Sequence, residues 1–320
     1  MNEQALSHPN PQTDLTGGKW GKGFSANQSV RKAARCILEA RLKAIWHWLP
    51  LAAEKSDEDA EYVHQLRISV RRAAQALRMF ADLLPDDLRE AVRARLRQIR
   101  LAADGARNWD VLRACFAHSA ASPAEGVTAR FAAQTQQRRR EAQQPLVDVY
   151  HELTAAGFAA QIDALLSALQ SSRKGKADRS FRQQARRYLR PVLKKFFKAA
   201  AAGVSNDEAL HRLRLRTKKL RYTMELVAVA FAPGFRRRLY PRISMLQDMM
   251  GTVTDHATTQ VLFQDWLRTS PDVEERAFCE GVLLAESRAH ADVHREFLAV
   301  WTPETVARLR RQFGLYCDLP

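Results

Sequence analysis

A short pattern of one histidine and several cations occurs twice in this chain of 320 residues, and the two copies begin 147 positions apart. The first copy runs from His64 to Arg72 and the second from His211 to Tyr222. Both contain His-x-Leu-Arg, and two adjacent basic residues follow. An internal repeat restricts the fold, because each copy is expected to form the same local structure in its own half. The chain is therefore predicted to consist of two related halves.

The first copy has the spacing of an amphipathic helix. If His64 is placed at 0° and each residue advances about 100°, then Arg67, Arg71 and Arg78 fall between roughly 300° and 340°. A separate apolar stripe lies between about 160° and 240° and consists of Leu66, Val70, Ala73, Leu77 and Phe80. The segment is thus predicted to be a helix that buries one face and presents cations on another.

The second copy keeps this arrangement. Its basic stripe consists of His211, Arg214, Lys218 and Arg221, and its apolar stripe consists of Leu213, Thr217, Leu220, Met224 and Val227. The first copy has four arginines and no acid as far as Arg78, and the second has six basic residues and no acid as far as Arg221. Solvated helix faces usually mix charges of both signs, because like charges one turn apart repel. We therefore expect a ligand to supply the counter-charge.

The overall charge also favours a polyanionic partner. The chain has 51 basic and 35 acidic residues, a net charge of +16, which suits nucleic acid, an anionic membrane surface or polyphosphate. Further basic clusters occur at Arg138, Arg139 and Arg140 and at Arg236, Arg237 and Arg238, and we expect these to be peripheral exposed charges. A hydrophobic content of 46% is enough for a packed core.

Several site types are not indicated by the sequence. The four cysteines are far apart and form no metal-binding spacing, which is typical of reduced thiols in a cytoplasmic protein. His290 and His294 are one turn apart, but no third ligand is evident, so we predict neither a metal site nor a cofactor. The longest apolar runs are too short to span a bilayer, so no membrane insertion is expected.

The chain reads as all-α from Ser29 onwards, with glycine and proline at the expected breaks. Helices are predicted near 29–48, 58–84, 86–103, 107–120, 125–143, 146–171, 178–202, 206–231, 235–250, 255–268, 272–300 and 303–313. Short connections between amphipathic helices favour antiparallel packing. We expect a disordered leader at 1–27, followed by two tandem antiparallel four-helix-bundle-like repeats at 28–172 and 177–315. The repeats are expected to be related by a pseudo-two-fold axis, to form one domain together, and to enclose a basic channel.

The two basic helices carry a recognisable motif. A histidine, an arginine three residues later and two cations after a further gap resemble the hallmark of the CHAD domain, the conserved histidine α-helical domain. The segment 105–111 (GARNWDV) is similar to the family's Gly followed by Arg-Asp-x-Asp-Val, and 246–255 (LQDMMGTVTD) to its Leu-Gln-Asp-x-Leu-Gly-x-x-Asn-Asp. Ala73 and Ala74 depart from the Leu-Arg of the first motif. The resemblance covers roughly residues 29–315.

The resemblance implies non-catalytic binding of inorganic polyphosphate in a basic channel, and association with polyphosphate granules and possible granule proteins. The residues taken as ligands are His64, Arg67, Arg71, Arg72, Arg78, His211, Arg214, Lys218, Lys219 and Arg221. Four neighbours are added as secondary candidates, namely Arg35, Arg107, Arg190 and Tyr222.

Two other functions stay open at this point. A nucleic-acid binder fits the charge, but the basic stripes lack interleaved aromatic residues, and Tyr222 is the aromatic residue that adjoins them. Nucleic acid is therefore expected as a non-specific competitor. A hydrolase of phosphate chains normally needs acidic metal ligands or an activated nucleophile, and the basic faces show no carboxylate cluster. The expected protein is not an enzyme.

Overall fold

The computed structural model describes residues 18–118, 125–171, 179–270 and 272–317. Its helices are α1 (Val30–Glu54), α2 (Glu61–Met79), α3 (Asp86–His118), α4 (Glu125–Glu141), α5 (Gln144–Ala155), α6 (Phe158–Ser171), α7 (Phe181–Ala201), α8 (Asp207–Val227), α9 (Tyr240–Thr269), α10 (Val273–Val300) and α11 (Pro303–Cys317). Short helical turns are η2 (Ala81–Leu83), η3 (Ala228–Ala230) and η4 (Phe235–Leu239). Within the described residues, β-pairing is limited to one bridge between Ser29 and Ser180. The predicted all-α class is confirmed.

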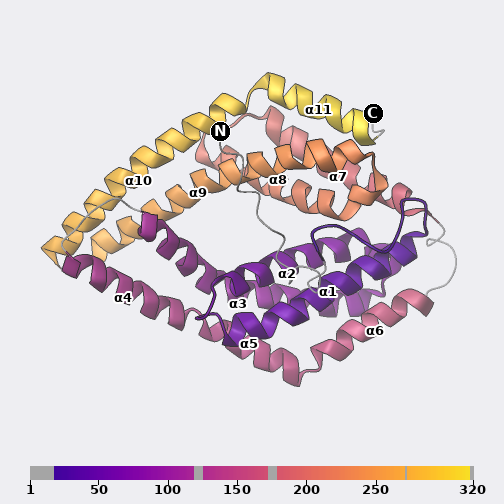
Figure 1. Ribbon diagram of the computed structural model, residues 1–320, viewed down its shortest axis with the longest axis horizontal. Coiled ribbons are helices and arrows are strands. Elements are labelled where there is room, and N and C mark those ends of the chain that lie inside the picture. Colours follow the sequence, from indigo (N-terminus) through magenta and orange to yellow (C-terminus); the bar gives the residue numbers. More distant parts are fainter. Residues whose placement is uncertain (1–17, 119–124, 172–178, 271, 318–320) are drawn as a thin grey trace, which may run out of the picture.

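The helices form two groups that meet along the basic helices. In Figure 1, α1, α2, α3, α5 and α6 lie in the lower group, and α7, α8, α10 and α11 lie in the upper group with the start of α9. Helix α2 packs against α1 and α3, and α8 packs against α7 and α9. Across the groups, α2 contacts α8 and α3 contacts α9. The relation of the two groups by duplication stays a prediction from the sequence.

Both basic helices bury the apolar stripes that the sequence predicts. The stripe residues of α2 and α8 are all buried, namely Leu66, Val70, Ala73, Leu77, Phe80, Leu213, Thr217, Leu220, Met224 and Val227. Burying one large apolar side chain contributes about 1.5–3 kcal/mol. This burial fixes the rotation of each helix about its axis. The cationic stripes consequently point away from the core of their own group.

Helix boundaries differ from the predictions mainly at glycines. Helix α3 continues through Gly105 and α9 continues through Gly251, so in each case two predicted helices are one. A glycine inside a helix is unfavourable by only about 1 kcal/mol, which packing along a long helix outweighs. At Gly157 the reverse occurs, because a φ of +65° ends α5 and the predicted helix 146–171 divides into α5 and α6.

Residues 18–28 belong to the folded part of the chain. The buried guanidinium of Arg41 donates to the carbonyl oxygens of Gly18 and Lys19, at 2.9 and 2.8 Å. Phe24 packs edge-on against Phe181 of α7, with ring centroids 4.8 Å apart. The expected disordered leader is therefore wrong for residues 18–27, while residues 1–17 lie outside the described residues. The segment links α1 to α7 across the two groups.

One of the basic clusters is structural. Arg139 on α4 is only 1% exposed, and its Nε donates to Oδ1 of Asp110 on α3 at 3.0 Å. The expectation that this whole cluster is peripheral is wrong for Arg139, because a buried carboxylate on the neighbouring helix neutralises it. None of the helices in the described residues combines the length and the apolar composition that crossing a membrane requires.

Candidate anion-binding site

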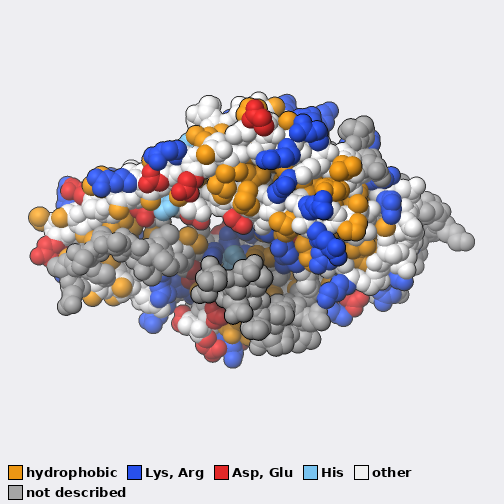
Figure 2. Space-filling view, turned by 45° about the horizontal axis from the view of Figure 1, so that its top comes forward, with side chains coloured by type: hydrophobic (Ala, Val, Ile, Leu, Met, Phe, Trp, Pro, Cys, Tyr) orange, Lys and Arg blue, Asp and Glu red, His pale blue; other side chains and the backbone are white. Residues whose placement is uncertain are grey.

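Two adjoining hollows lie where α2 and α8 meet. The first, called here the acid-free hollow, has a volume of about 420 Å³ and is lined by α2, α3 and α8. The second, called here the mixed hollow, has a volume of about 570 Å³ and extends to α9. Arg71, Lys218 and Tyr222 line both, so the two hollows share a boundary. Figure 2 shows the surface hollowed near its centre, with Lys and Arg side chains inside.

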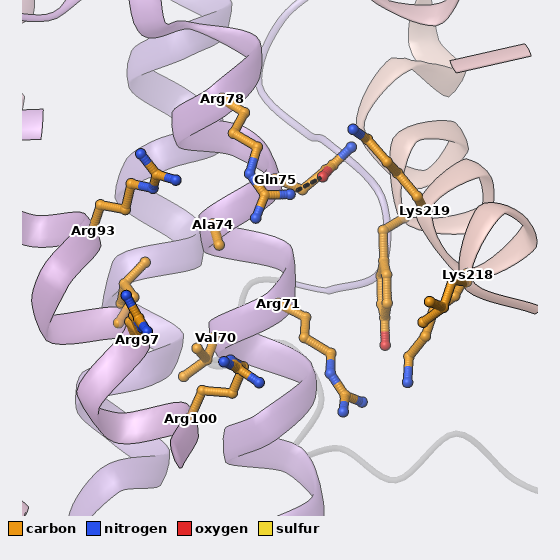
Figure 3. Close-up of a pocket in the computed structure, with 13 residues that line it drawn as sticks. Val70, Arg71, Ala74, Gln75, Arg78, Arg93, Arg97, Arg100, Lys218 and Lys219 are labelled. Carbon is orange, nitrogen blue, oxygen red and sulfur yellow. Dashed lines mark hydrogen bonds between the residues drawn. The ribbon is translucent and has the colours of Figure 1, made fainter. Parts of the chain in front are cut away.

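The acid-free hollow concentrates cations from three helices. Its basic residues are Arg71, Arg78, Arg93, Arg97, Arg100, Lys218 and Lys219, and no Asp or Glu is among the described residues that line it. Figure 3 shows Arg71 of α2 and Lys218 of α8 extending into the same space from opposite sides. Arg78 donates to the side chain of Gln75 at 3.2 Å. Arg93 and Arg100 pair with Glu90 and Asp104, at 3.1 and 3.4 Å, and neither of these acids lines the hollow. The lining itself therefore offers many donors and a net positive charge.

Lys218 is the most strongly perturbed of these cations. Burial, and after it repulsion from Arg71 and Arg214, lowers the pKa of its amine to about 7. Burial and the nearby Arg78 also lower the pKa of Lys219. Both pKa shifts have the same cause, because each ammonium ion is poorly solvated and has neighbours of the same charge. An anion bound in the hollow would relieve both effects.

The mixed hollow contains acids as well as bases. Arg67 forms an ion pair with Asp104 of α3, and Nη2 of Arg214 lies 3.9 Å from Oδ1 of Asp255. Burial and the nearby Arg107 lower the pKa of His64, which lines this hollow too. The expectation of stripes without counter-charge is therefore wrong for these two arginines, because α3 and α9 supply carboxylates that are remote in the sequence.

Arg72 and Arg221 neutralise a buried acid. Glu225 of α8 has no exposed surface, and Nε of Arg72 donates to its Oε2 at 2.7 Å. Arg221 Nη1 lies 3.2 Å from Glu225 Oε1, and the hydroxyl of Tyr240 donates to the same oxygen at 2.7 Å. Arg72 lines neither hollow, so the prediction of Arg72 as a ligand does not match its position. Arg221 also lines the mixed hollow.

The remaining predicted residues divide by position. Arg107 lines the mixed hollow and Tyr222 lines both hollows. His211, Arg35 and Arg190 are exposed and are not among the residues that line either hollow. His211 thus differs from His64, although the two histidines occupy the same place in the sequence pattern.

The third wall of the acid-free hollow was missed by the sequence reasoning. Arg93, Arg97 and Arg100 of α3 line it together with Leu96. Their spacing of four and three residues places them on one helix face, which is the signal that identified the other two basic helices. The repeated pattern does not mark them, because this segment has no histidine and lies outside the two copies.

Comparison with known proteins identifies the family. A model of the CHAD domain matches residues 36–264, more than half of the chain. The chain belongs to the CHAD family. The crystal structure of the CHAD domain from the plant Ricinus communis is similar, with a TM-score of 0.67, 23% sequence identity, and coverage of 86% of this chain and 95% of that chain. PptA from Streptomyces chartreusis gives a TM-score of 0.61 with 18% identity, covering 86% and 99%.

These similarities apply at different levels. No curated protein matches the chain. The two solved structures support the fold of this CHAD domain alone, because their sequence identities to it are low. Membership of the CHAD family supports a role related to polyphosphate. The matched segment 36–264 includes α2, α3 and α8, which supply all the residues of the acid-free hollow.

Proposed function

We propose that this CHAD domain binds inorganic polyphosphate without hydrolysing it, in the acid-free hollow and the adjoining part of the mixed hollow. The observation that carries the proposal is the set of seven cations from three helices around a hollow whose described lining contains no carboxylate. Polyphosphate has about one negative charge per phosphate and no bases, so its recognition needs spaced cations and donors. Arginine contributes a planar fork of donors and lysine a mobile point charge.

The positions of the lining residues suggest a different role for each part of the site. Arg71 and Lys218 border both hollows, so a phosphate at the boundary contacts both of them. Cations one helical turn apart are about 5–6 Å apart, which is of the same order as the phosphate spacing in a nucleic-acid strand. A linear anion lying along the hollow therefore meets a series of cations along its length. His64 adds a ring nitrogen at the far side of the mixed hollow from Arg78.

Nucleic acid is the weaker candidate ligand. Single-strand binding normally relies on exposed aromatic rings on which bases stack. Tyr222 is the aromatic residue in the described lining of both hollows and is only 6% exposed, with the Arg221 guanidinium carbon 4.7 Å from its ring centroid. The site accordingly offers charge without a stacking platform, which suits a phosphate chain better.

Binding without hydrolysis fits the carboxylates of the site. Phosphoryl transfer commonly uses carboxylates that hold metal ions or position the nucleophile. Asp248 and Asp255 line the mixed hollow, where Asp255 lies beside Arg214, and no carboxylate is among the described residues of the acid-free hollow. Incubation of the protein with polyphosphate and Mg²⁺ should release no orthophosphate above the level of a protein-free sample. Release that scales with protein concentration would contradict this part of the proposal.

Calorimetry with long-chain polyphosphate tests the binding itself. The wild type should bind saturably, and affinity should fall as salt rises because bound counterions are released. Changing Arg71→Glu and Lys218→Glu together should abolish binding. Changing Arg237→Glu and Arg238→Glu alters the net charge equally on η4, where both side chains are exposed, and should weaken binding only slightly. Equal losses in the two variants would show that net charge, not the site, drives association.

Competition and localisation extend the test. At equal concentrations of negative charge, single-stranded nucleic acid should displace little bound polyphosphate. Efficient displacement would remove the proposed preference. In a cell that accumulates polyphosphate granules, a fluorescent fusion of the wild type should collect on the granules, while the fusion that carries Arg71→Glu and Lys218→Glu should stay dispersed.

A further inference from the structure

A third basic hollow lies between α7 and α8, and it is called here the lysine groove. It has a volume of about 680 Å³. Its basic residues are Lys194, Lys195, Lys198, Arg212 and Arg216, and no Asp or Glu is among the described residues that line it. The rest of the lining is small or aliphatic, and it includes Leu215, which is 49% exposed. The groove thus combines basic side chains with an exposed apolar residue.

The lysine groove continues the acid-free hollow. Leu215 lines both of them, so the two surfaces meet at this residue on α8. Lys219 belongs to the acid-free hollow, yet Lys195 and Arg216 of the groove repel its ammonium ion and help to lower its pKa. The cations therefore follow one another from α3 and α2, across Lys219, to α7.

The charge of α7 is unusual for a solvated helix. From Phe181 to Ala201 the helix has seven basic residues and no acid. An ordinary exposed face mixes charges of both signs, because like charges one turn apart destabilise a helix. Among the cations that line the groove, Arg212 forms an ion pair with Glu208 on the exposed side of α8. In the described residues, Lys194, Lys195 and Lys198 have no carboxylate within ion-pair distance.

We propose that a long polyphosphate chain leaves the acid-free hollow over Lys219 and continues along the lysine groove. The groove is then a second segment of the binding site, which short chains do not reach. This inference rests on the proposed function, since it concerns the same ligand. It makes the affinity of the domain depend on chain length. The continuity of the cations and the acid-free face of α7 favour a polyanion over an acidic protein segment as the occupant.

Affinity measurements with two ligands test the second segment. Changing Lys194→Ala, Lys195→Ala and Lys198→Ala together should weaken binding of long-chain polyphosphate about tenfold and lower the salt slope by about 2, since three phosphate contacts are lost. Tripolyphosphate should bind this variant within about twofold of the wild type, because the central hollows are intact. The matched control carries Arg276→Ala, Arg288→Ala and Arg295→Ala. These three residues are exposed on α10, and their substitution removes the same amount of positive charge.

The outcomes separate the two proposals. If the α7 and α10 variants lose the same long-chain affinity, the second segment is wrong although the central site stands. If the wild type binds neither ligand, the proposed function fails and this inference fails with it. Statistical gains from many positions on a long chain apply equally to both variants, so the ratio of their affinities is free of this effect.

Lysine acylation reports where the bound ligand lies, which an affinity measurement does not. Long-chain polyphosphate should protect Lys194, Lys195 and Lys198 from acylation, as measured by mass spectrometry, while tripolyphosphate should protect Lys218 and Lys219 alone. Acylation of the three α7 lysines at an unchanged rate with long chains bound would overturn the inference. That result would favour an acidic protein segment as the occupant of the groove, because such a segment also fits its positive charge and apolar lining.

Discussion

Arg71 and Arg72 are adjacent in the sequence, but one has cations as neighbours and the other has a carboxylate. Arg71 faces other cations at the boundary of the two hollows, whereas Arg72 donates to the buried Glu225. Adjacent residues on a helix are about 100° apart, so one side chain reaches the hollow while the next reaches the contact between α2 and α8. One cation of the doublet thus lines the proposed binding site, and the other forms a structural ion pair.

This difference predicts opposite effects of two alanine substitutions. Arg72→Ala should lower the free energy of unfolding by about 3 kcal/mol, because a fully buried carboxylate loses one of its partners. Arg71→Ala should leave unfolding nearly unchanged and weaken polyphosphate binding instead. Urea denaturation and calorimetry measure the two quantities. A folded Arg72→Ala protein that loses as much affinity as Arg71→Ala would show that Arg72 contacts the ligand.

Lys218 predicts a pH dependence of binding. Its amine has a pKa of about 7 in the free protein, and a bound polyanion raises that pKa. Below pH 7 both states hold the proton; above it, binding must take up a proton, so affinity should fall as pH rises from about 7 to 9, by at most about tenfold per pH unit. Calorimetry at several pH values measures this.

The control for Lys218 is a permanent cation. Lys218→Arg should bind with little change in affinity over the same pH range, because arginine keeps its charge. Burial and the nearby Arg107 lower the pKa of His64, which is a shift away from this range. Parallel pH profiles of the wild type and the Lys218→Arg variant would show that another group takes up the proton.

At the scale of the helix, periodicity predicted which face is buried. The stripes of α2 and α8 were assigned from spacing alone, and the burial of Leu66 and Leu213 confirms them. Spacing also placed His64, Arg67 and Arg71 on a common face, and all three line the mixed hollow. A helical pattern contains this information because side chains three and four residues apart point the same way.

The partners of these side chains were not predictable from the same pattern. Asp104 and Asp255 reach Arg67 and Arg214 from α3 and α9, and such contacts depend on how helices pack. Glu225 is remote from Arg72 in the sequence and meets it only across the two groups. The predicted lengths of α3 and α9 were wrong for a related reason, because packing keeps each of these helices continuous across its glycine.

Helix α3 supplies a test of the wall that the sequence reasoning missed. Arg97→Glu introduces a carboxylate into the acid-free hollow and should weaken polyphosphate binding at least tenfold, because one contact is replaced by repulsion. Arg113→Glu on the same helix is the control, since this exposed residue lies about 160° away around the helix and is outside both hollows. Equal affinities of the two variants would mean that α3 does not contribute to the site.

At the scale of the molecule, the proposed binding site lies where the two groups of helices meet. The acid-free hollow takes its cations from α2 and α3 of one group and from α8 of the other. Repulsion across it opposes the approach of the two groups, while the Arg72–Glu225 pair and the bond from Gln75 to Thr223 hold them together. The free protein is therefore expected to gain stability from anything that screens its cations.

Salt should consequently raise the Tm of the free protein and weaken its binding of polyphosphate. Raising NaCl from about 0.05 to about 0.5 M shortens the Debye length from about 14 to about 4 Å, which screens repulsion in a chain of net charge +16. A gain of 1 kcal/mol corresponds to about 1.5 °C in a chain of 320 residues, since the unfolding entropy is about 2.1 cal/mol/K per residue. The variant Arg71→Gln with Lys218→Gln should show a smaller rise, because less repulsion remains to be screened. A Tm that falls with salt would mean that ion pairs outweigh the repulsion between cations in the free protein.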